Sequence, residues 1–194
     1  MAEAGRVIAG KARGIRLLAP GAGTRPLGDR VKQTLFAILA PDLPGSAVLD
    51  LCAGSGAAGI EALSRGATRA VFVEREAAVV RAIVENLRRT GLDGPGVQVV
   101  ITDAVRYLAG EAGAVTGPFD IIVLDPPYAQ PALLGRLLEA LGADASGRLL
   151  ANGGTVVAKH FWRDAPPPTV GLLASVRDRR FGETGLTFYR REGG

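Results

Sequence analysis

Short apolar runs alternate with longer amphipathic stretches from about residue 47 to residue 158. Nearly continuous apolar runs are typical of strands buried on both faces, and the stretches between them have the spacing of helices. The predicted strands are 47–51, 70–74, 97–102, 119–124 and 155–158, and the predicted helices are 56–65, 76–90, 104–111 and 131–141. This alternation predicts an α/β fold with a mostly parallel sheet covered by helices on both faces.

The C-terminal segment has a different pattern, that of a closing β-hairpin. Residues 175–181 and 186–190 are strand-like, and the turn Gly182-Glu183-Thr184-Gly185 lies between them. These two strands bring the predicted sheet to seven strands. Ligands of such sheets bind beyond the carboxyl ends of the parallel strands, so functional residues are expected directly after each strand.

The N-terminal segment predicts a small hairpin followed by a helix. Val7-Ile8 and residues 15–18 are strand-like, with a basic turn flanked by Gly10 and Gly14 between them. Further along, Asp29 can cap a helix that runs to about Leu39. We therefore divide the chain into an N-terminal extension, residues 1–40, and a main domain, residues 41–194.

Basic side chains concentrate in this extension. Residues 1–40 hold seven Lys or Arg against two acidic residues, a net +5 in a chain whose total is +4. A local excess of this kind favours a polyanionic partner such as nucleic acid, although a solvated surface would also explain it. The candidate RNA-facing residues are Arg6, Lys11, Arg13, Arg16, Arg25 and Arg30.

The remaining composition, 47% hydrophobic and 22% charged, is that of an ordinary globular protein. Cys52 is the only cysteine, which excludes an intrachain disulfide and is compatible with a reducing cytosol. Residues 1–10 have no apolar run of signal-peptide length, and no stretch approaches the roughly 20 apolar residues needed to span a bilayer. We therefore expect a cytoplasmic protein without membrane association.

A glycine-rich loop follows the first predicted strand of the main domain. Residues 54–59, Gly-Ser-Gly-Ala-Ala-Gly, satisfy the G-x-G-x-x-G pattern of dinucleotide binders. Glu74 lies twenty residues after Gly54, where that pattern has an acid for the ribose hydroxyls. By itself this arrangement supports NAD and S-adenosylmethionine about equally.

Two further acids favour S-adenosylmethionine. Asp50 precedes the loop, where a carboxylate can help to hold the charged amino-acid end of this donor and would repel the pyrophosphate of NAD. Asp103 follows the third strand, where it can accept a hydrogen bond from the adenine amine. A helix cap or a solvated strand end is the alternative for each acid. The predicted donor-binding residues are Asp50, Ala53, Gly54, Ser55, Gly56, Glu74, Asp103 and Ala104.

The most specific motif is Asp125-Pro126-Pro127-Tyr128, directly after the fourth strand. An exocyclic amine of a base is a poor nucleophile because its lone pair is delocalised into the ring. Asp125 and the Pro126 carbonyl can accept its two hydrogens, and the prolines stiffen the backbone that carries them. Tyr128 can stack on the extruded base. These four residues are the predicted catalytic residues, while a proline-rich turn without function is the alternative.

The chain resembles the RsmD family of bacterial small-subunit rRNA guanine-N2 methyltransferases. Five blocks carry the resemblance, which extends from about residue 5 to residue 191: residues 6–14, 29–36, 48–56, 59–67 and 125–128. It implies a class I S-adenosylmethionine-dependent methyltransferase fold, which is Rossmann-like, and methylation of guanine 966 of 16S rRNA. S-Adenosylhomocysteine is the implied product, and the small ribosomal subunit is the implied partner of what we expect to be a monomer.

Some positions depart from the family pattern. Leu27 and Gly28 follow Arg25-Pro26, Gln33 replaces a usual Glu, and Cys52 replaces a usual aromatic residue. We interpret Cys52 as a small buried filler rather than a nucleophile. Residues 159–163, Lys-His-Phe-Trp-Arg, replace an acidic stretch. They predict either a basic and aromatic RNA contact or, as we favour, a strand end with Phe161 and Trp162 packed over the sheet. His160 has no Cys or second His beside it, so no metal site is expected.

Other functions fit the sequence less well. A DNA amino-methyltransferase is the principal alternative enzyme, but no separate target-recognition domain is visible. A protein glutamine methyltransferase would typically have Asn where Asp125 stands, and an NAD oxidoreductase lacks a residue set for hydride transfer. A non-catalytic rRNA-binding assembly factor is the remaining alternative, and the intact motif at residues 125–128 argues against it.

Overall fold

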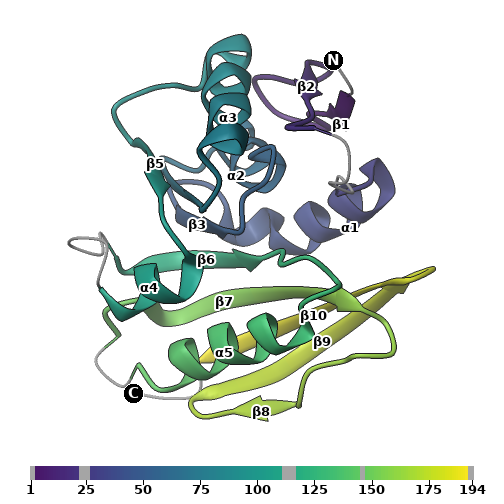
Figure 1. The fold of residues 1–194 in the computed structure, drawn as a ribbon, viewed down its shortest axis with the longest axis vertical. Helices are drawn as coiled ribbons and strands as arrows, with labels where there is room; N and C mark the ends of the chain where they lie inside the picture. Colours follow the sequence, from purple (N-terminus) through teal and green to yellow (C-terminus); the bar gives the residue numbers. More distant parts are fainter. Residues whose placement is uncertain (1–2, 22–26, 111–116, 145–146, 192–194) are drawn as a thin grey trace. The chain divides into compact units, whose positions relative to one another are not determined.

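The computed structural model of the chain describes residues 3–21, 27–110, 117–144 and 147–191 (Figure 1). It divides into two compact units, residues 1–102 and residues 103–194. Each unit has its own strands and helices, which are described separately below. No helix in the described part of the chain is both long enough and apolar enough to cross a membrane.

The first unit contains a parallel three-stranded sheet in the order β5-β4-β3. Its strands are β3 (Ala47–Leu51), β4 (Arg69–Glu74) and β5 (Val97–Ile101), and the helices α2 (Ala57–Ser64) and α3 (Ala77–Thr90) pack on them. All five elements were predicted, with differences of one residue at most ends. Ala70 and Phe72 alternate along β4, and both are buried in one hydrophobic cluster with residues of α2 and α3.

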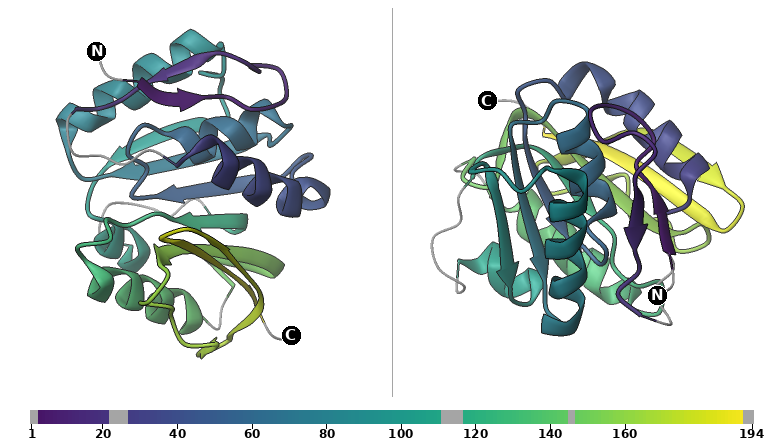
Figure 2. Two further views of the ribbon diagram at one scale, coloured as in Figure 1. Left: turned by 90° about the vertical axis from the view of Figure 1, so that its right-hand side faces the viewer. Right: turned by 90° about the horizontal axis from the view of Figure 1, so that it is seen from above.

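The N-terminal hairpin belongs to the first unit and lies beside α3 in both views of Figure 2. Its strands are β1 (Glu3–Arg6) and β2 (Arg16–Leu18), so the predicted first strand at Val7-Ile8 is wrong. The reason is that the Ile8 and Ala9 amides donate to the Glu61 carboxylate of α2, at 2.7 and 3.0 Å, instead of to a strand. The predicted turn between Gly10 and Gly14 is confirmed.

The helix after the hairpin is α1 (Asp29–Leu39), over the predicted range. The predicted cap is wrong, because Gly28 is the N-cap residue and the Asp29 carboxylate accepts a hydrogen bond from Arg6 instead. A single 3-10 turn, η1 (Ala40–Asp42), continues it. Pro41 is compatible with this turn because it stands among the first residues, where a helical element needs no amide donor.

The second unit contains α4 (Ala104–Ala109), β6 (Phe119–Leu124), α5 (Pro131–Gly142), β7 (Leu150–Phe161), β8 (Thr169–Val170), β9 (Leu173–Phe181) and β10 (Thr184–Arg191). Its strands are ordered β6-β7-β10-β9-β8. β6 and β7 are parallel, whereas β10 is antiparallel to both β7 and β9. The predicted closing hairpin is therefore confirmed, and all seven predicted sheet strands are present.

The length of β7 differs from the prediction of 155–158. The strand has twelve residues, and its partners on β6 jump from Leu150 beside Phe119 to Thr155 beside Ile121. The intervening Asn152-Gly153-Gly154 has the composition of a turn, but it forms an irregularity inside the strand. The two-residue β8 is too short to leave a pattern in the sequence and was not predicted.

Candidate functional site

The glycine loop directly follows β3, at the carboxyl end of the strand. Its backbone winds through left-handed conformations at Cys52 (φ 61°), Gly54 (φ 56°) and Gly56 (φ 75°). A Cβ atom added at Gly54 would have nothing within 4 Å, so the backbone there is open to close approach by a ligand. Cys52 is half-buried in a conformation unusual for a residue with a side chain, so its interpretation as a buried filler is wrong.

Gly59, the third glycine of the pattern, is required by the close packing of α2 on β4. A Cβ atom added at Gly59 would lie 2.3 Å from Cε1 of Phe72 on β4. A Cβ atom at Gly56 would meet Phe72, Ile60 and Ile83 at 3.2 to 3.3 Å. These contacts show that the glycines allow α2 to approach the sheet closely, which fixes where the loop turns.

Asp50 lies beneath this loop rather than on its surface. The residue is 1% exposed, and its Oδ2 atom accepts a hydrogen bond of 2.9 Å from the Gly59 amide in the first turn of α2. A buried carboxylate bonded in this way holds the loop and the helix start in one geometry. The structure therefore gives Asp50 a role in shaping the loop, beside the predicted contact with a donor.

Glu74 ends β4 and borders the loop. Its Oε2 atom accepts a hydrogen bond of 3.1 Å from the Gly54 amide. Its Oε1 atom accepts bonds from the amides of Arg75 (2.8 Å) and Glu76 (3.1 Å). The structure thus brings together Glu74 and Gly54, two of the predicted donor-binding residues. The carboxylate is half-buried at the strand end, where a hydroxyl-bearing ligand can reach it.

Asn86 of α3 is a residue of this site that the sequence did not indicate. Its amide nitrogen donates to the carbonyl of Ser55 (2.9 Å) and to the carbonyl of Leu18 (3.0 Å). Its Oδ1 atom accepts from the Leu18 amide at 2.7 Å. Asn86 is 0% exposed, and its three hydrogen bonds join the glycine loop to the N-terminal hairpin. No motif surrounds it, and only the fold shows what it joins.

Asp103 belongs to the second unit and caps α4. Its Oδ1 atom accepts from the amides of Val105 (2.9 Å) and Arg106 (3.3 Å), while Ala104 is buried. The alternative of a helix cap is therefore real for this acid. Only Oδ1 takes part in these bonds, which leaves Oδ2 for a further hydrogen bond.

The predicted catalytic turn, residues 125–128, follows β6 in the second unit. Asp125 is half-buried, with 24% of its side chain exposed, and Pro126 is buried. The Pro127 carbonyl accepts a hydrogen bond of 2.9 Å from the Gln130 amide, which closes the turn. Within the described ranges nothing donates to the Pro126 carbonyl, so the acceptor that the chemistry requires is unused.

The sequence indicated Lys159 only as part of the basic and aromatic stretch at 159–163, and not as a neighbour of Asp125. Its ammonium contacts Oδ1 of Asp125, and its Nζ atom lies 4.9 Å from the centroid of the Tyr128 ring. The side chain is only 9% exposed. A signal was nevertheless present, because Lys159 and Asp125 each directly follow a predicted strand. Parallel pairing of Leu124 with Ala158 makes the two residues neighbours.

Tyr128 is fixed at both ends of its side chain. Its hydroxyl lies 2.8 Å from Oγ1 of Thr184 on β10, and its ring lies 6.3 Å from the Phe161 ring at a tilt of 54°. A tyrosine held in this way presents a flat face at low entropic cost, which suits stacking on a base.

His160 is 7% exposed and hydrogen-bonds to the Phe161 carbonyl (2.8 Å) and to the Thr187 hydroxyl (3.1 Å). It supports the sheet between β7 and β10. The strand end predicted here is confirmed, since β7 ends at Phe161. The Trp162 ring, however, contacts guanidinium groups of Arg163 and Arg180.

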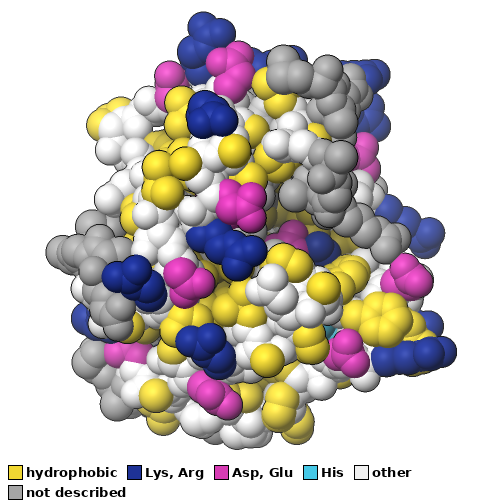
Figure 3. Space-filling view, in the orientation of Figure 1, with side chains coloured by type: hydrophobic (Ala, Val, Ile, Leu, Met, Phe, Trp, Pro, Cys, Tyr) yellow, Lys and Arg dark blue, Asp and Glu magenta, His cyan; other side chains and the backbone are white. Residues whose placement is uncertain are grey.

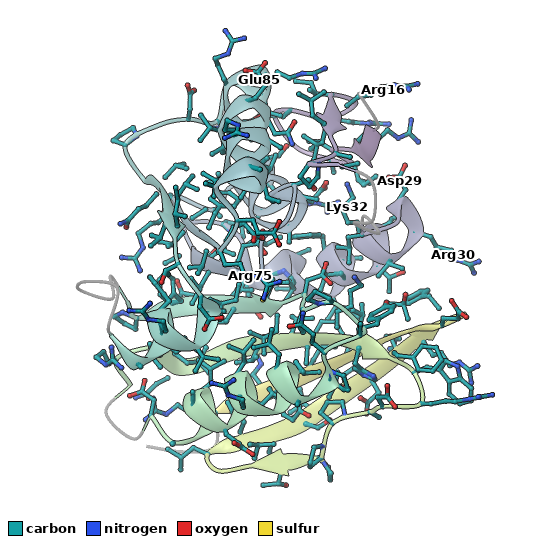
Figure 4. The ribbon with its side chains drawn as sticks, in the orientation of Figure 1. Arg16, Asp29, Arg30, Lys32, Arg75 and Glu85 are labelled. Carbon is teal, nitrogen blue, oxygen red and sulfur yellow. The ribbon has the colours of Figure 1, made fainter. Side chains whose placement is uncertain are left out.

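Most of the predicted RNA-facing residues are exposed on the first unit: Arg6, Lys11, Arg13, Arg16 and Arg30. Figure 4 shows Arg16 and Arg30 pointing outward from β2 and α1, and Figure 3 shows basic side chains over the same elements. Arg25 lies outside the described residues. Arg6 forms an exposed ion pair with Asp29 at 3.2 Å, which reduces the charge it offers to a partner.

The basic turn is held by α2. The Lys11 amide donates to the Ser64 carbonyl (2.8 Å), and the Ser64 hydroxyl accepts from the Ala12 amide (2.9 Å). A Cβ atom at Gly10 would lie 1.8 Å from the Ser64 carbonyl oxygen, so only glycine fits. Lys11 and Arg13 therefore project from a rigid support.

Lys32 of α1 is the buried cation of this unit. It is 0% exposed and donates to the Arg6 carbonyl. Burial lowers the pKa of Lys32, while the charges of Glu61 and Asp29 oppose that shift. Its place beneath the hairpin, visible in Figure 4, indicates a structural role.

The model of the family "Conserved hypothetical protein 95" matches residues 5–190. YlbH of Bacillus subtilis is 38% identical to this chain over 97% of it and 100% of the relative. The ribosomal RNA small subunit methyltransferase D of Escherichia coli is 32% identical over 96% of this chain and 90% of the relative. The solved structure of yhhF from Escherichia coli has 33% identity and a TM-score of 0.80, covering 97% of this chain and 98% of that one.

Proposed function

Because this chain belongs to the RsmD family, whose model covers almost all of it, we propose that it methylates the exocyclic N2 amine of a guanine in 16S rRNA. The chain has the Rossmann-like methyltransferase fold and is an S-adenosylmethionine-dependent methyltransferase. Guanine 966 is the proposed target, and the small ribosomal subunit is the proposed substrate. Action in the cytoplasm and as a monomer are parts of the same proposal.

The choice of an amine as the target rests on a pair of hydrogen-bond acceptors that follow β6. The Asp125 carboxylate uses Oδ1 for Lys159, and the described residues donate nothing to its Oδ2 or to the Pro126 carbonyl. An amine with two hydrogens needs two acceptors. Oδ2 of the Asp125 carboxylate and the Pro126 carbonyl supply them, because the Lys159 ammonium occupies Oδ1 alone.

The role of these acceptors is to make a weak nucleophile reactive. When Asp125 and the Pro126 carbonyl hold both hydrogens, the amine nitrogen becomes more tetrahedral and its lone pair is withdrawn from conjugation with the ring. Positioning of this kind can accelerate a reaction by several orders of magnitude. Transfer of the methyl group would break its bond to the sulfonium, release S-adenosylhomocysteine and form the nitrogen–carbon bond, and the proton lost from the nitrogen passes to Asp125 or to water.

Lys159 keeps the Asp125 carboxylate in place for this task. Its ammonium holds one oxygen and lies over the ring of Tyr128, so one side chain positions both the acceptor and the stacking surface. Both contacts are well shielded because Lys159 is nearly buried, which strengthens them relative to exposed pairs.

The glycine loop fits S-adenosylmethionine. Gly54 has open space where a Cβ atom would lie, so a ligand can approach its backbone. The Glu74 carboxylate lies beside Gly54 at the end of β4, a position that suits hydrogen bonds to ribose hydroxyls. We assign to donor binding Asp50, Ala53, Gly54, Ser55, Gly56 and Glu74 of the first unit, with Asp103 and Ala104 of the second. When bound, S-adenosylmethionine supplies an electrophilic methyl group on a sulfonium.

The substrate class is tested by offering three acceptors to the enzyme in parallel: small ribosomal subunits that lack the modification, free 16S rRNA and duplex DNA. Radiolabelled S-adenosylmethionine reports transfer to each. The proposal predicts transfer to subunits or to rRNA and none to DNA. Transfer to DNA alone would keep the methyltransferase and overturn the proposed substrate.

A further inference from the structure

A basic and aromatic cluster lies at the end of β7, next to the catalytic turn and within the same unit. We define the Trp162 cluster as Phe161, Trp162, Arg163 and Arg180. The Cζ atom of Arg180 lies 3.5 Å from the centroid of the Trp162 ring, and the Cζ atom of Arg163 lies 4.9 Å from it. One indole ring therefore organises two guanidinium groups.

The backbone of the cluster is held by the closing hairpin. The Trp162 amide donates to the Glu183 carbonyl at 3.0 Å, and Nε of Arg180 donates to the Gly182 carbonyl at the same distance. These bonds join the end of β7 to the turn between β9 and β10. These hydrogen bonds therefore hold Trp162 and Arg180 in fixed positions.

The two guanidinium groups are available to a partner. Arg163 and Arg180 are exposed, and no carboxylate of the described residues forms an ion pair with either. Figure 3 shows hydrophobic and basic side chains next to one another over the end of β9 and the turn after β7. A guanidinium stacked on an aromatic ring loses little entropy on binding and keeps its edge N–H groups for a phosphate.

Aromatic rings connect this surface to the catalytic turn. The Trp162 and Phe161 rings are 6.3 Å apart, and Phe161 lies 6.3 Å from Tyr128. Exposed guanidinium groups beside partly exposed aromatic rings are usual contacts of single-stranded nucleic acid, whose bases stack and whose phosphates bind Arg.

We propose that the Trp162 cluster binds the RNA strand next to the target guanine, with Arg163 and Arg180 on its phosphates. This inference rests on the proposed function and adds a second RNA contact, separate from the N-terminal basic turn. Trp162 serves as the platform that aims both guanidinium groups, and an unstacked base beside the target can continue the row of rings from Phe161.

The first experiment uses Trp162 as its own reporter, because it is the only tryptophan of the chain. A short oligoribonucleotide with the sequence around the target guanine is titrated into the full-length protein, with tryptophan emission recorded beside the anisotropy of labelled RNA. The proposal predicts that emission changes in step with anisotropy. Saturated anisotropy with unchanged emission would overturn it.

The second experiment compares two double variants of equal charge. Arg163→Gln with Arg180→Gln is expected to weaken RNA binding about tenfold or more and to lower the slope of log affinity against log salt by between one and two. The control, Arg88→Gln with Arg89→Gln, removes two exposed charges from α3 and is expected to change the affinity little. Equal effects of both pairs would overturn the proposal.

A third readout separates this inference from the proposed function. Trp162→Ala is expected to raise KM for the RNA about tenfold by loss of stacking and aiming, with Trp162→Phe retaining much of the affinity. The melting temperature of each variant shows whether it is folded. Normal RNA methylation by all cluster variants would overturn the cluster alone, whereas a wild-type protein that neither binds nor methylates RNA would overturn both.

Discussion

The ammonium of Lys159 contacts the carboxylate of Asp125, across the parallel pair formed by β6 and β7. Because Leu124 pairs with Ala158, the residues that follow each strand become neighbours. Lys159 also lies over the Tyr128 ring, so it contacts both ends of the turn formed by residues 125–128. Lys159 at the end of β7 thereby orients Asp125 and Tyr128, which follow β6.

This relationship predicts the effect of replacing Lys159. Lys159→Met is expected to lower kcat for methyl transfer about tenfold to a hundredfold, because Asp125 and Tyr128 lose their common support. Donor affinity, measured by calorimetry, should remain near that of the wild type. Lys159→Arg should recover much of the rate, because a guanidinium can also bind the carboxylate. An unchanged kcat in Lys159→Met would contradict the role of Lys159 in positioning Asp125 and Tyr128.

A second prediction concerns the approach of α2 to the sheet. Gly59→Ala places a Cβ atom 2.3 Å from Phe72 and is expected to destabilise the protein by about 1–3 kcal/mol, with weaker donor binding because the loop shifts. Denaturant unfolding measures the first effect. Gly135→Ala is the matched control, because nothing lies within 4 Å of its Cβ in α5, and it should stabilise slightly. Equal stability of both variants would contradict the close approach.

The basic turn of the N-terminal hairpin predicts a salt-dependent loss of RNA binding. Replacing Lys11, Arg13 and Arg16 together by Gln should weaken binding and reduce the salt slope by about two to three. The control replaces Arg81, Arg88 and Arg89, three exposed arginines of α3, by Gln. A salt slope that falls only in the control would place the RNA contact elsewhere.

Tyr189 predicts how stability depends on alkaline pH. The side chain is 0% exposed, its hydroxyl donates to the Pro167 carbonyl at 2.7 Å, and burial raises its pKa to about 12. A raised pKa in the folded state means that the native protein keeps a proton that the unfolded chain loses. The stability from Tyr189 is therefore complete below about pH 10 and is lost as the pH rises toward about 12.

Tyr189→Phe isolates that contribution. At neutral pH it should cost about 1 kcal/mol through the lost hydrogen bond. Between about pH 10 and 12 its unfolding free energy should fall less steeply than that of the wild type. Urea unfolding at neutral and alkaline pH measures both, and parallel pH curves for the two proteins would contradict the assignment.

The sequence predicted most of the fold because each strand and helix carries its own pattern. The order and type of the elements and the closing hairpin followed from local spacing. The errors lie where tertiary contacts override local preference. Val7-Ile8 reads as a strand, yet the amides of Ile8 and Ala9 are taken by Glu61. Asn152-Gly153-Gly154 reads as a loop, yet it lies within β7.

The site was predicted in the same uneven way. Motif residues such as Asp125 and Gly54 stand out because unusual backbone or charge is needed there. Lys159 and Asn86 do not, because their roles depend on which strands and helices become neighbours. Asp50 shows a third case, in which the residue was identified and its burial beneath the loop was not.

The most direct test of the account is to identify the product nucleoside. Small subunits from a strain lacking this protein are incubated with labelled S-adenosylmethionine and either the wild type or Asp125→Ala, and the rRNA is digested and analysed by mass spectrometry with site mapping. We expect N2-methylguanosine at guanine 966 with the wild type and almost none with Asp125→Ala, although both proteins bind the donor. A methyl group on another atom, or full turnover by Asp125→Ala, would contradict it.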